Sequence, residues 1–356
     1  MPTLPHGARP ASRTAAPTAP RTLRRRARAA AALACAALLA GCGVRLDTPP
    51  PGAPSPDAIE ALRQDEAVNA ATIAQTVSQI TAADPAVSAQ LQAAAADAGA
   101  HAEALGGVWV AWPEGAPTGV ATPEVSTAAP VAEPGALDVL TLLRDGAASA
   151  RTGALQADDD ALAAALLAVS ISRGQGAAGL SAALGKDDTA SAGSPLTAED
   201  LLEHGAGGPT LLVLDSARFA LETVAARSQG VARTTAAGQA DHLQDLVDAA
   251  IAAGAPDERM GAYDFGAQPG DGGVVDGRAP AADGAGRGAV AAAGGVDLTP
   301  EQTLAVAAQE RLLEHWTHVA AGAGPGIREP LVAAAEDAAT QVRAWGGTLP
   351  AMPGLG

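Results

Sequence analysis

Apolar residues recur along most of the chain at steps of three and four positions. The clearest stripe consists of Val87, Leu91, Ala95, Ala98, Ala102 and Leu105. Side chains at these steps share one face of an α-helix, and such a face packs against neighbouring helices. Gly and Pro residues, which commonly end helices, separate the stretches that carry the stripes. The pattern therefore predicts an all-α protein.

These stretches pair into helical hairpins. Four hairpins are expected, each with a break at Gly, Pro or Asp residues: 57–105 at Asp84-Pro85, 136–184 at 158–160, 209–253 at Gly230, and 298–345 at Gly324-Pro325-Gly326. A Pro-, Thr- and Ala-rich linker covers 113–135, and a Gly-rich segment covers 254–295. Glycine-rich chain buries too little apolar surface to fold, so we expect disorder in the second segment.

The first and fourth hairpins resemble each other. A shift of 240 positions aligns Ala67–Pro113 with the fourth hairpin without a gap. The aligned pairs include Pro85 with Pro325, Leu91 with Leu331, Asp97 with Asp337, Gly106-Gly107 with Gly346-Gly347, and Pro113 with Pro353. Internal duplication explains this match, and so does a shared hairpin geometry without common descent. The sequence leaves both explanations open.

Composition strengthens the helical prediction. Alanine, which has the highest helix propensity, is abundant, and aromatic residues make up 2% of the chain. The helical pattern continues through 211–214, a Leu- and Val-rich run that would otherwise suit a short strand. Glycines at 174, 176 and 179 have the spacing of a dinucleotide-binding loop, but that loop requires a preceding strand. No strand is expected there, so the motif is not interpreted as a nucleotide site.

The N-terminus has the three parts of a secretion signal. Residues 1–28 contain seven arginines and no acidic residue, and the run 29–40 contains only Ala, Leu and Cys. This run is shorter than the about 20 apolar residues that cross a bilayer. Small residues follow it at the expected cleavage point. The arginines at 24–26 leave the export route open between the general secretory and twin-arginine pathways.

The end of this signal, Leu39-Ala40-Gly41-Cys42, resembles the lipobox of bacterial lipoproteins. The resemblance implies cleavage after Gly41, attachment of a diacylglyceryl group with chains such as palmitate to Cys42, and anchoring to the cell membrane on its extracytoplasmic side. Two or three acyl chains give a stable anchor, which one chain does not. The alternative is an ordinary cleaved signal with an incidental cysteine. We expect a lipoprotein signal peptide over 1–41.

Residues 42–56 are expected to form a tether. They contain five prolines, and proline-rich chain is extended and semi-rigid. Of the two cysteines, Cys35 leaves with the signal and Cys42 carries the lipid. The mature chain therefore has neither a disulfide nor a thiolate metal site, and its stability depends on packing.

Net charge excludes one class of partner. The whole chain has 22 basic and 39 acidic side chains, and removing the seven arginines before Cys42 leaves 15 basic and 39 acidic ones, a formal charge of −24. A surface this acidic repels phosphate backbones, so we expect no nucleic-acid binding. The membrane, through the lipid anchor, is the expected partner. The sequence identifies no protein partner, and it leaves the oligomeric state open.

Residues from about Pro209 to Leu355 resemble a ferritin-like domain family of unknown function that is common in actinobacteria. The matching pieces occur in order: Asp215, Arg218, Phe219, Glu222 and Arg227 in one helix; the turn 254–257; Gly261 and Tyr263; 310–316; and the ending 349–355. The resemblance implies a four-helix bundle with one long crossover. We therefore expect an N-terminal helical region over 57–185 and a ferritin-like bundle over 197–355 with a disordered insertion at 254–297.

Ferritin-like folds suggest a di-iron centre, whose ligands include Glu-x-x-His on each of two helices. That motif is absent from this chain, and so is Asp-x-x-His. The nearest substitutes include Asp215, Glu222, His242, Glu314 and His318, of which the last two lie one helical turn apart. A solvated polar face on an acidic protein is the favoured explanation of these residues. We expect no bound metal and no cofactor, and these five residues form a weak alternative metal site.

No Gly-x-Ser-x-Gly elbow occurs, and no thiol remains in the mature chain to act as a nucleophile. The sequence thus favours a membrane-anchored, extracytoplasmic structural or binding protein of the cell envelope that is not an enzyme. The alternative is a degenerate ferritin-like metal-carboxylate protein of the di-iron type.

Overall fold

The structure is a computed structural model that describes residues 53–118, 120, 133–186, 196–203, 208–263 and 297–355. The expected signal peptide, Cys42 and most of the Pro-rich and Gly-rich segments lie outside these residues. All the described helices belong to one compact unit, which comprises Ala53–Glu114 and Thr122–Gly356. A second unit, Met1–Gly52 with Gly115–Ala121, falls almost entirely outside the described residues.

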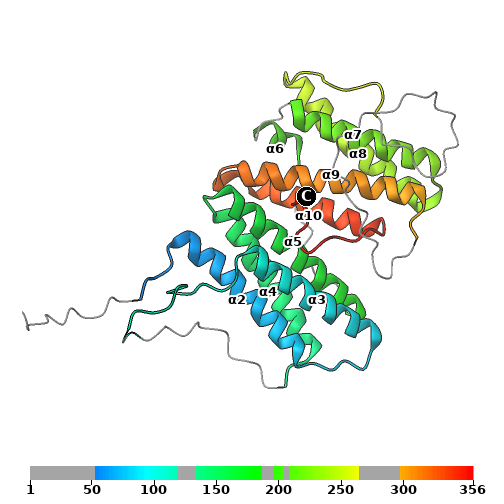
Figure 1. Cartoon of the computed structure of the whole chain (residues 1–356). Helices are drawn as coiled ribbons and strands as arrows, with labels where there is room; N and C mark the ends of the chain where they lie inside the picture. Colours follow the sequence, from blue (N-terminus) through cyan, green and yellow to red (C-terminus); the bar gives the residue numbers. More distant parts are fainter. Residues whose placement is uncertain are drawn as a thin grey trace, which may run out of the picture. The chain divides into compact units, whose positions relative to one another are not determined.

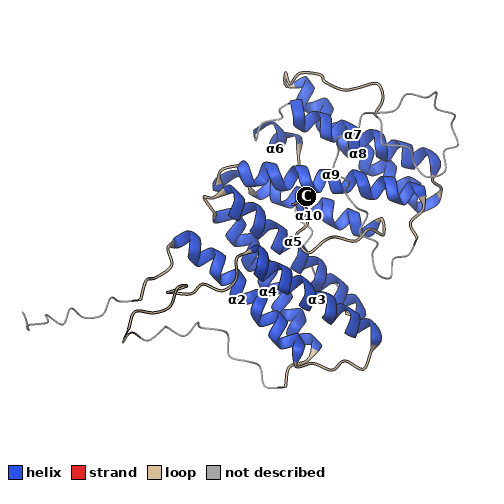
Figure 2. Ribbon diagram, in the orientation of Figure 1, coloured by secondary structure: helices blue, strands red, loops and turns tan. Residues whose placement is uncertain are grey.

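The described residues are all-α, as the apolar periodicity predicts, and they contain no strand (Figure 2). They form nine α-helices and one short 3₁₀-helix, labelled as in Figure 1: α2 Ala58–Ser78, α3 Pro85–Ala104, α4 Ala136–Gln156, α5 Asp160–Ala183, α6 Ala198–Glu203, α7 Gly208–Arg227, α8 Gly230–Ala252, α9 Pro300–Gly322, η1 Pro325–Ile327 and α10 Glu329–Ala344.

The four predicted hairpins are confirmed, and their breaks coincide with capping residues. The carboxylate of Asp84 accepts hydrogen bonds from the backbone N–H groups of Ala86 and Val87, and Asp159 accepts one from Leu162. These bonds satisfy N–H groups that a helix leaves without partners in its first turn. The break at 324–326 also lies between two helices: α9 ends at Gly322, Pro325 begins the 3₁₀ turn η1, and α10 starts at Glu329. The short helix α6 was not predicted.

The first four helices form the N-terminal bundle (Figure 1). The hairpins α2–α3 and α4–α5 pack side by side, with α2 against α4 and α3 against α5. Ile73, Leu91, Val139 and Leu180, one from each helix, are buried in its core. Helix α5 is buried on nearly all sides, because it also packs against α9. This double burial explains its almost continuous apolar sequence.

The last four long helices form the C-terminal bundle. Helices α7 and α8 pack as one hairpin, α9 and α10 as another, and α7 contacts α9 across them. Leu221, Val247, Leu312 and Val342 are buried in the shared core. The short helix α6 packs on α8.

A buried arginine joins the two bundles. Arg328, which is 2% exposed, donates hydrogen bonds to carbonyl oxygens of Ala154 (3.0 Å) and Ala157 at the end of α4. It also donates to Ala320 (2.9 Å) and Ala321 (2.8 Å) at the end of α9. The last carbonyls of a helix lack intrahelical partners and carry partial negative charge. One guanidinium therefore caps the C-termini of two helices from different bundles.

The first and fourth hairpins end in the same backbone geometry. In α3 the N–H of Leu105 donates to the carbonyl of His101 and the N–H of Gly107 donates to Ala102, at 2.9 and 2.7 Å. The residues 240 positions later make the same bonds, from Trp345 to Gln341 at 3.0 Å and from Gly347 to Val342 at 2.9 Å. Duplication and shared hairpin geometry both predict this match, so it does not separate them.

Candidate functional site

The two carboxylates suggested as metal ligands on α7 belong to an ion-pair network. Asp215 is fully buried, and its carboxylate accepts hydrogen bonds from Nε of Arg218 (2.8 Å) and from the hydroxyl of Tyr263. Glu222, whose side chain is 51% exposed, accepts from Nη1 of the same arginine at 2.6 Å. Asp215 therefore holds the segment after α8 against α7, and both carboxylates are neutralised by a cation.

The other three suggested ligands are exposed and lie apart from that network. His242 is on α8, and Glu314 and His318 are on the outer face of α9. Between the last two, His315 is half-buried and lies 3.2 Å from the hydroxyl of Thr210, and burial lowers its pKa to about 4. Within the described ranges, no group of three or more His, Cys, Asp and Glu side chains is arranged to hold a metal ion.

A buried charge cluster lies in the N-terminal bundle. The guanidinium of Arg173 on α5 is paired with the carboxylate of Glu66 on α2, and both side chains are at most 3% exposed. The same guanidinium donates to the carbonyls of Gly146 (3.0 Å) and Glu66 (2.9 Å), and the hydroxyl of Ser149 donates to Glu66 at 2.6 Å. Gly146 permits this approach, because a Cβ there would lie 3.1 Å from the guanidinium nitrogen.

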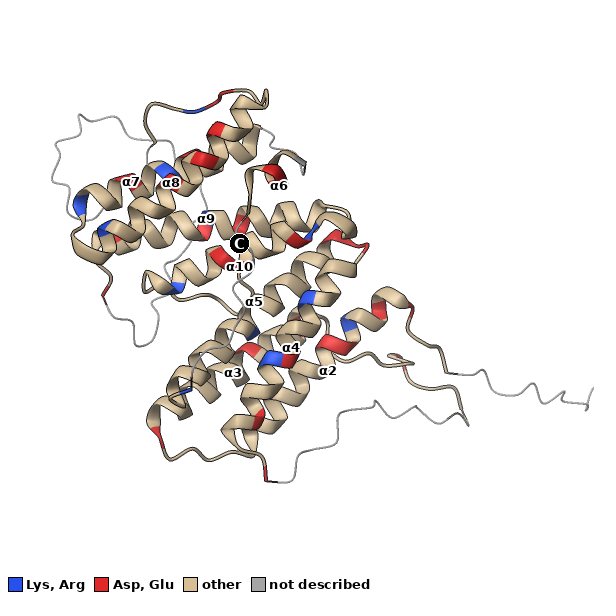
Figure 3. Cartoon of the chain, turned by 180° about the vertical axis from the view of Figure 1, so that it is seen from behind, with Lys and Arg blue, Asp and Glu red and all other residues tan. Residues whose placement is uncertain are grey.

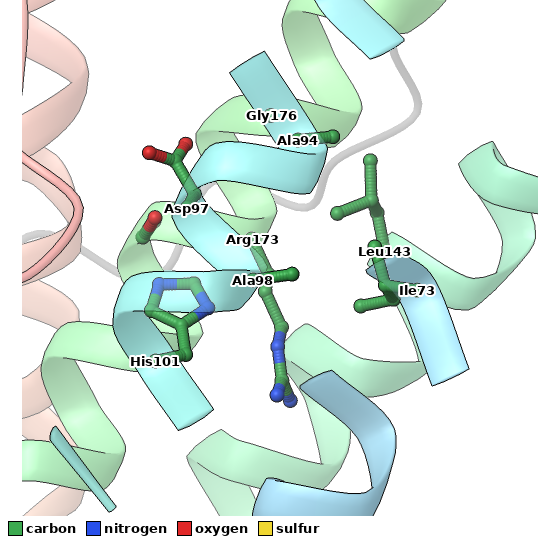
Figure 4. A pocket seen from close by; sticks show the side chains of 9 residues that line it. Ile73, Ala94, Asp97, Ala98, His101, Leu143, Arg173 and Gly176 are labelled. Atoms are coloured by element: carbon green, nitrogen blue, oxygen red, sulfur yellow. The ribbon is translucent and has the colours of Figure 1, made fainter. Parts of the chain in front are cut away.

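A small pocket lies beside this cluster (Figure 4). Asp97 and His101 of α3 lie on one side of it, Ile73 and Leu143 on the other, and Arg173 lies between them. Its volume of about 10 Å³ admits one water molecule and no larger ligand. The charge cluster is therefore best explained as part of the packing between α2, α3, α4 and α5.

His101 links this pocket to the end of the chain. Its Nε2 donates to the carbonyl oxygen of Ala351 at 2.9 Å, across 250 positions of sequence. Burial and the nearby Arg173 cation lower the pKa of His101 to about 4. The imidazole is therefore neutral at physiological pH, with its proton on Nε2 because a carbonyl oxygen only accepts.

The larger cavity lies in the C-terminal bundle and has a volume of about 120 Å³. Most of its wall is apolar, and its lining comes from α7, α8, α9 and α10 and from Leu196, two positions before α6. The apolar residues are Leu196, Leu214, Leu243, Leu246, Leu312, Trp316, Ala334 and Ala338. Three polar side chains complete it, and these are His242, Gln309 and Asp337. Of these, Gln309 is buried, whereas His242 and Asp337 are exposed.

A network of side-chain amides forms the polar edge of this cavity. Nε2 of Gln309 donates to Oε1 of Gln239 at 3.3 Å, and Nε2 of Gln239 donates to Oε1 of Gln341 at 2.6 Å. Gln341 in turn donates to Asp337 at 3.3 Å, and the indole of Trp345 donates to Gln239 at 3.1 Å. The network spans α8, α9 and α10 and ends at the carboxylate of Asp337. The cavity therefore combines apolar contact with hydrogen bonding, which is the chemistry of a binding site.

The amide network was missed in the sequence. Its three glutamines have no characteristic spacing, because they come from three helices that only the fold brings together. Both Trp316, within α9, and Trp345, directly after α10, are buried. The glycines at 174, 176 and 179 lie inside α5, so the exclusion of a dinucleotide loop is confirmed.

The electrostatic surroundings of the cavity are acidic. Helix α8 carries three exposed carboxylates, Asp241, Asp245 and Asp248, and one exposed arginine, Arg233 (Figure 3). The exposed Asp337 at the cavity adds another carboxylate. A cation approaching this face meets a favourable field, and an anion an unfavourable one.

Comparisons with protein-family models, with curated proteins and with solved structures found no match for this chain. Among the described helices, α5 is the one long and apolar enough to cross a membrane. In the structure 61% of its apolar stretch is buried inside the protein, which is typical of a core helix.

Proposed function

We propose that this protein is a lipid-anchored binding protein of the bacterial cell envelope and that it is not an enzyme. The observation that carries the proposal is the lipobox-like Leu39-Ala40-Gly41-Cys42, placed directly after a basic segment and a short apolar run. A signal of this form directs export, and a cysteine at this position is the acceptor for lipid. The membrane is then the protein's first partner.

The start of the folded part agrees with a tether. The carboxylate of Asp57 caps α2 by accepting from the N–H of Glu60 at 2.8 Å, so regular structure begins directly after the Pro-rich segment 42–56. If that segment is fully extended, its 15 residues span roughly 45 Å. A segment of this length suits a tether between a lipid anchor and a folded part.

We further propose that the C-terminal bundle is ferritin-like in topology but binds no di-iron centre. Its two hairpins, α7–α8 and α9–α10, are joined through the long segment 254–297, which is the connection expected for that fold. Ferritin-like metal proteins direct Glu and His side chains into the bundle. In this chain Gln239, Gln309 and Gln341 make the interior hydrogen bonds of the corresponding helices, and amides are poor ligands for iron.

The anchor is tested by Cys42→Ser. We expect the variant to take up no labelled fatty acid and to leave the detergent phase, because the thiol is the acceptor for the lipid. The measurement is detergent partitioning of cells fed with labelled fatty acid. Cys35→Ser is the matched control, since it changes the other cysteine of the signal and should remain lipidated. A wild-type protein without label, or a Cys42→Ser protein that partitions unchanged, would contradict the anchor.

The metal alternative is tested by elemental analysis. Protein purified without chelator and dialysed into metal-free buffer is expected to retain well under one iron or manganese per chain, because the suggested ligands either pair with Arg218 or lie apart on exposed faces. Two retained metals per chain that disappear in the double variant Glu314→Ala, His318→Ala would replace the binding proposal with the metal-carboxylate one.

A further inference from the structure

We infer that the cavity of the C-terminal bundle binds a small organic amine, one with a compact apolar group about the size of a benzene ring. The volume sets the size of this group. An apolar cavity of about 150 Å³ in a helical protein holds benzene, and the 120 Å³ found here is slightly smaller and partly open. A group of about six carbon atoms therefore fills it, with the rest of the molecule towards the opening.

The wall determines that this group is apolar. Five leucines and Trp316 line the cavity. Leu196 precedes α6, the other leucines and Trp316 come from α7, α8 and α9, and α10 contributes Ala334 and Ala338. The two alanines create the space, since a leucine at either position would extend into it. An apolar group placed there removes hydrocarbon surface from water on both sides of the contact, which favours binding.

The polar edge determines that the head is a hydrogen-bond donor with positive charge. Gln309 is 4% exposed and donates one amide N–H to Gln239, so its carbonyl oxygen, an acceptor, and its second N–H remain to bond a ligand. One carboxylate oxygen of Asp337 accepts a hydrogen bond from the amide of Gln341 at 3.3 Å. The second oxygen can accept a hydrogen bond from a ligand. An ammonium group satisfies both acceptors, whereas a carboxylate head would be repelled by Asp337 and by the carboxylates of α8.

This inference rests on the proposed binding role and deepens it by naming a ligand class. The test uses the full unlipidated chain, Cys42→Ser, with isothermal titration calorimetry of four probes: benzylamine, benzyl alcohol, toluene and benzoate. We expect benzylamine to bind one per chain with a Kd of roughly 1 mM or below. Benzyl alcohol and toluene should bind more weakly, and benzoate should bind weakest. Benzoate binding as tightly as benzylamine, or no saturable binding of any probe, would overturn the inference.

Two variants locate the site. Asp337→Asn should weaken benzylamine binding about threefold to tenfold and leave toluene unchanged, because an exposed ion pair contributes modestly. Asp241→Asn, an equally exposed carboxylate that does not line the cavity, is the matched control and should change affinity by roughly twofold or less. Ala338→Leu should abolish binding of all probes. Full benzylamine binding by a folded Ala338→Leu chain, or equal effects of the two Asp→Asn changes, would place the ligand elsewhere. The lipid-labelling result on wild-type protein does not depend on this cavity. A negative result in the binding test therefore does not contradict the lipid anchor.

Discussion

Replacing Arg328 by methionine is expected to lower the free energy of unfolding by about 4 kcal/mol. The methionine fills similar space but leaves the carbonyl oxygens of Ala154, Ala157 and Ala321 without a donor. The carbonyl of Ala320 keeps only the N–H of Ala323, at 3.3 Å. Each buried carbonyl that loses its partner costs about 1–3 kcal/mol, and partial access of water reduces the sum. The contact between α5 and α9 remains, so the chain should still fold.

The measurement is urea unfolding followed by far-UV circular dichroism. Arg328→Lys should fall between wild type and methionine, because an ammonium group reaches fewer of the carbonyls than a planar guanidinium does. Arg233→Met, an exposed arginine on α8, is the matched control and should change stability by about 0.5 kcal/mol or less. Equal effects at the two arginines would show that Arg328 does not join the bundles.

The second large effect expected is a loss of stability in mild acid that depends on His101. In the unfolded chain an imidazole takes up a proton near pH 6.5, whereas the pKa of folded His101 is about 4. Between these values the unfolded state binds more protons, so stability is complete above pH 6.5 and falls as pH is lowered towards 4. The difference between the two pKa values corresponds to about 3 kcal/mol of unfolding free energy for this one residue.

The groups that face His101 explain the direction of this effect. Arg173 from α5 and its partner Glu66 from α2 lie on one side, Asp97 belongs to the same helix, and Ala351 occupies Nε2. Burial raises the pKa of Asp97, so this carboxyl offsets part of the loss seen in wild-type protein. The comparison of variants removes that contribution, because both chains contain Asp97.

His101→Gln keeps a donor for Ala351 but cannot titrate. We expect its unfolding free energy, measured in urea at pH 7, 6, 5 and 4.5, to fall less steeply with acid than that of wild type. His242→Gln, which replaces an exposed histidine of α8, is the matched control. Parallel curves for His101→Gln and wild type would show that this histidine is not the acid-sensitive group.

The helices were predictable because they depend on local sequence. Asp84 and Asp159 cap the helices that follow them, and Gly106 and Gly346, at φ of +74° and +91°, end helices in a conformation that favours glycine. The helix α6 was missed, because six residues carry too few apolar positions to show a period.

The candidate site was less predictable, because its residues are distant in sequence. Gln239 and Gln309 are 70 positions apart, and Gln239 and Gln341 are 102 apart. Glutamine is also common on helix surfaces, so its presence inside a bundle has no local signal. Asp215 shows the opposite error: it resembles a ligand in sequence, although its partner Arg218 stands three positions later, at a spacing that brings side chains together on a helix.

The bond between His101 and Ala351 makes the order of synthesis matter. Its acceptor lies among the last residues of the 356-residue chain, beyond α10, whereas its donor lies in the second helix described here. A nascent chain that still lacks the residues after Trp345 contains His101 but not the carbonyl that accepts its hydrogen bond. The N-terminal bundle therefore completes its hydrogen bonding only after the residues beyond α10 have been synthesised. A chain that folds as it is synthesised therefore leaves this bond unmade until both bundles are present, so the N-terminal bundle reaches its full stability only together with the C-terminal one.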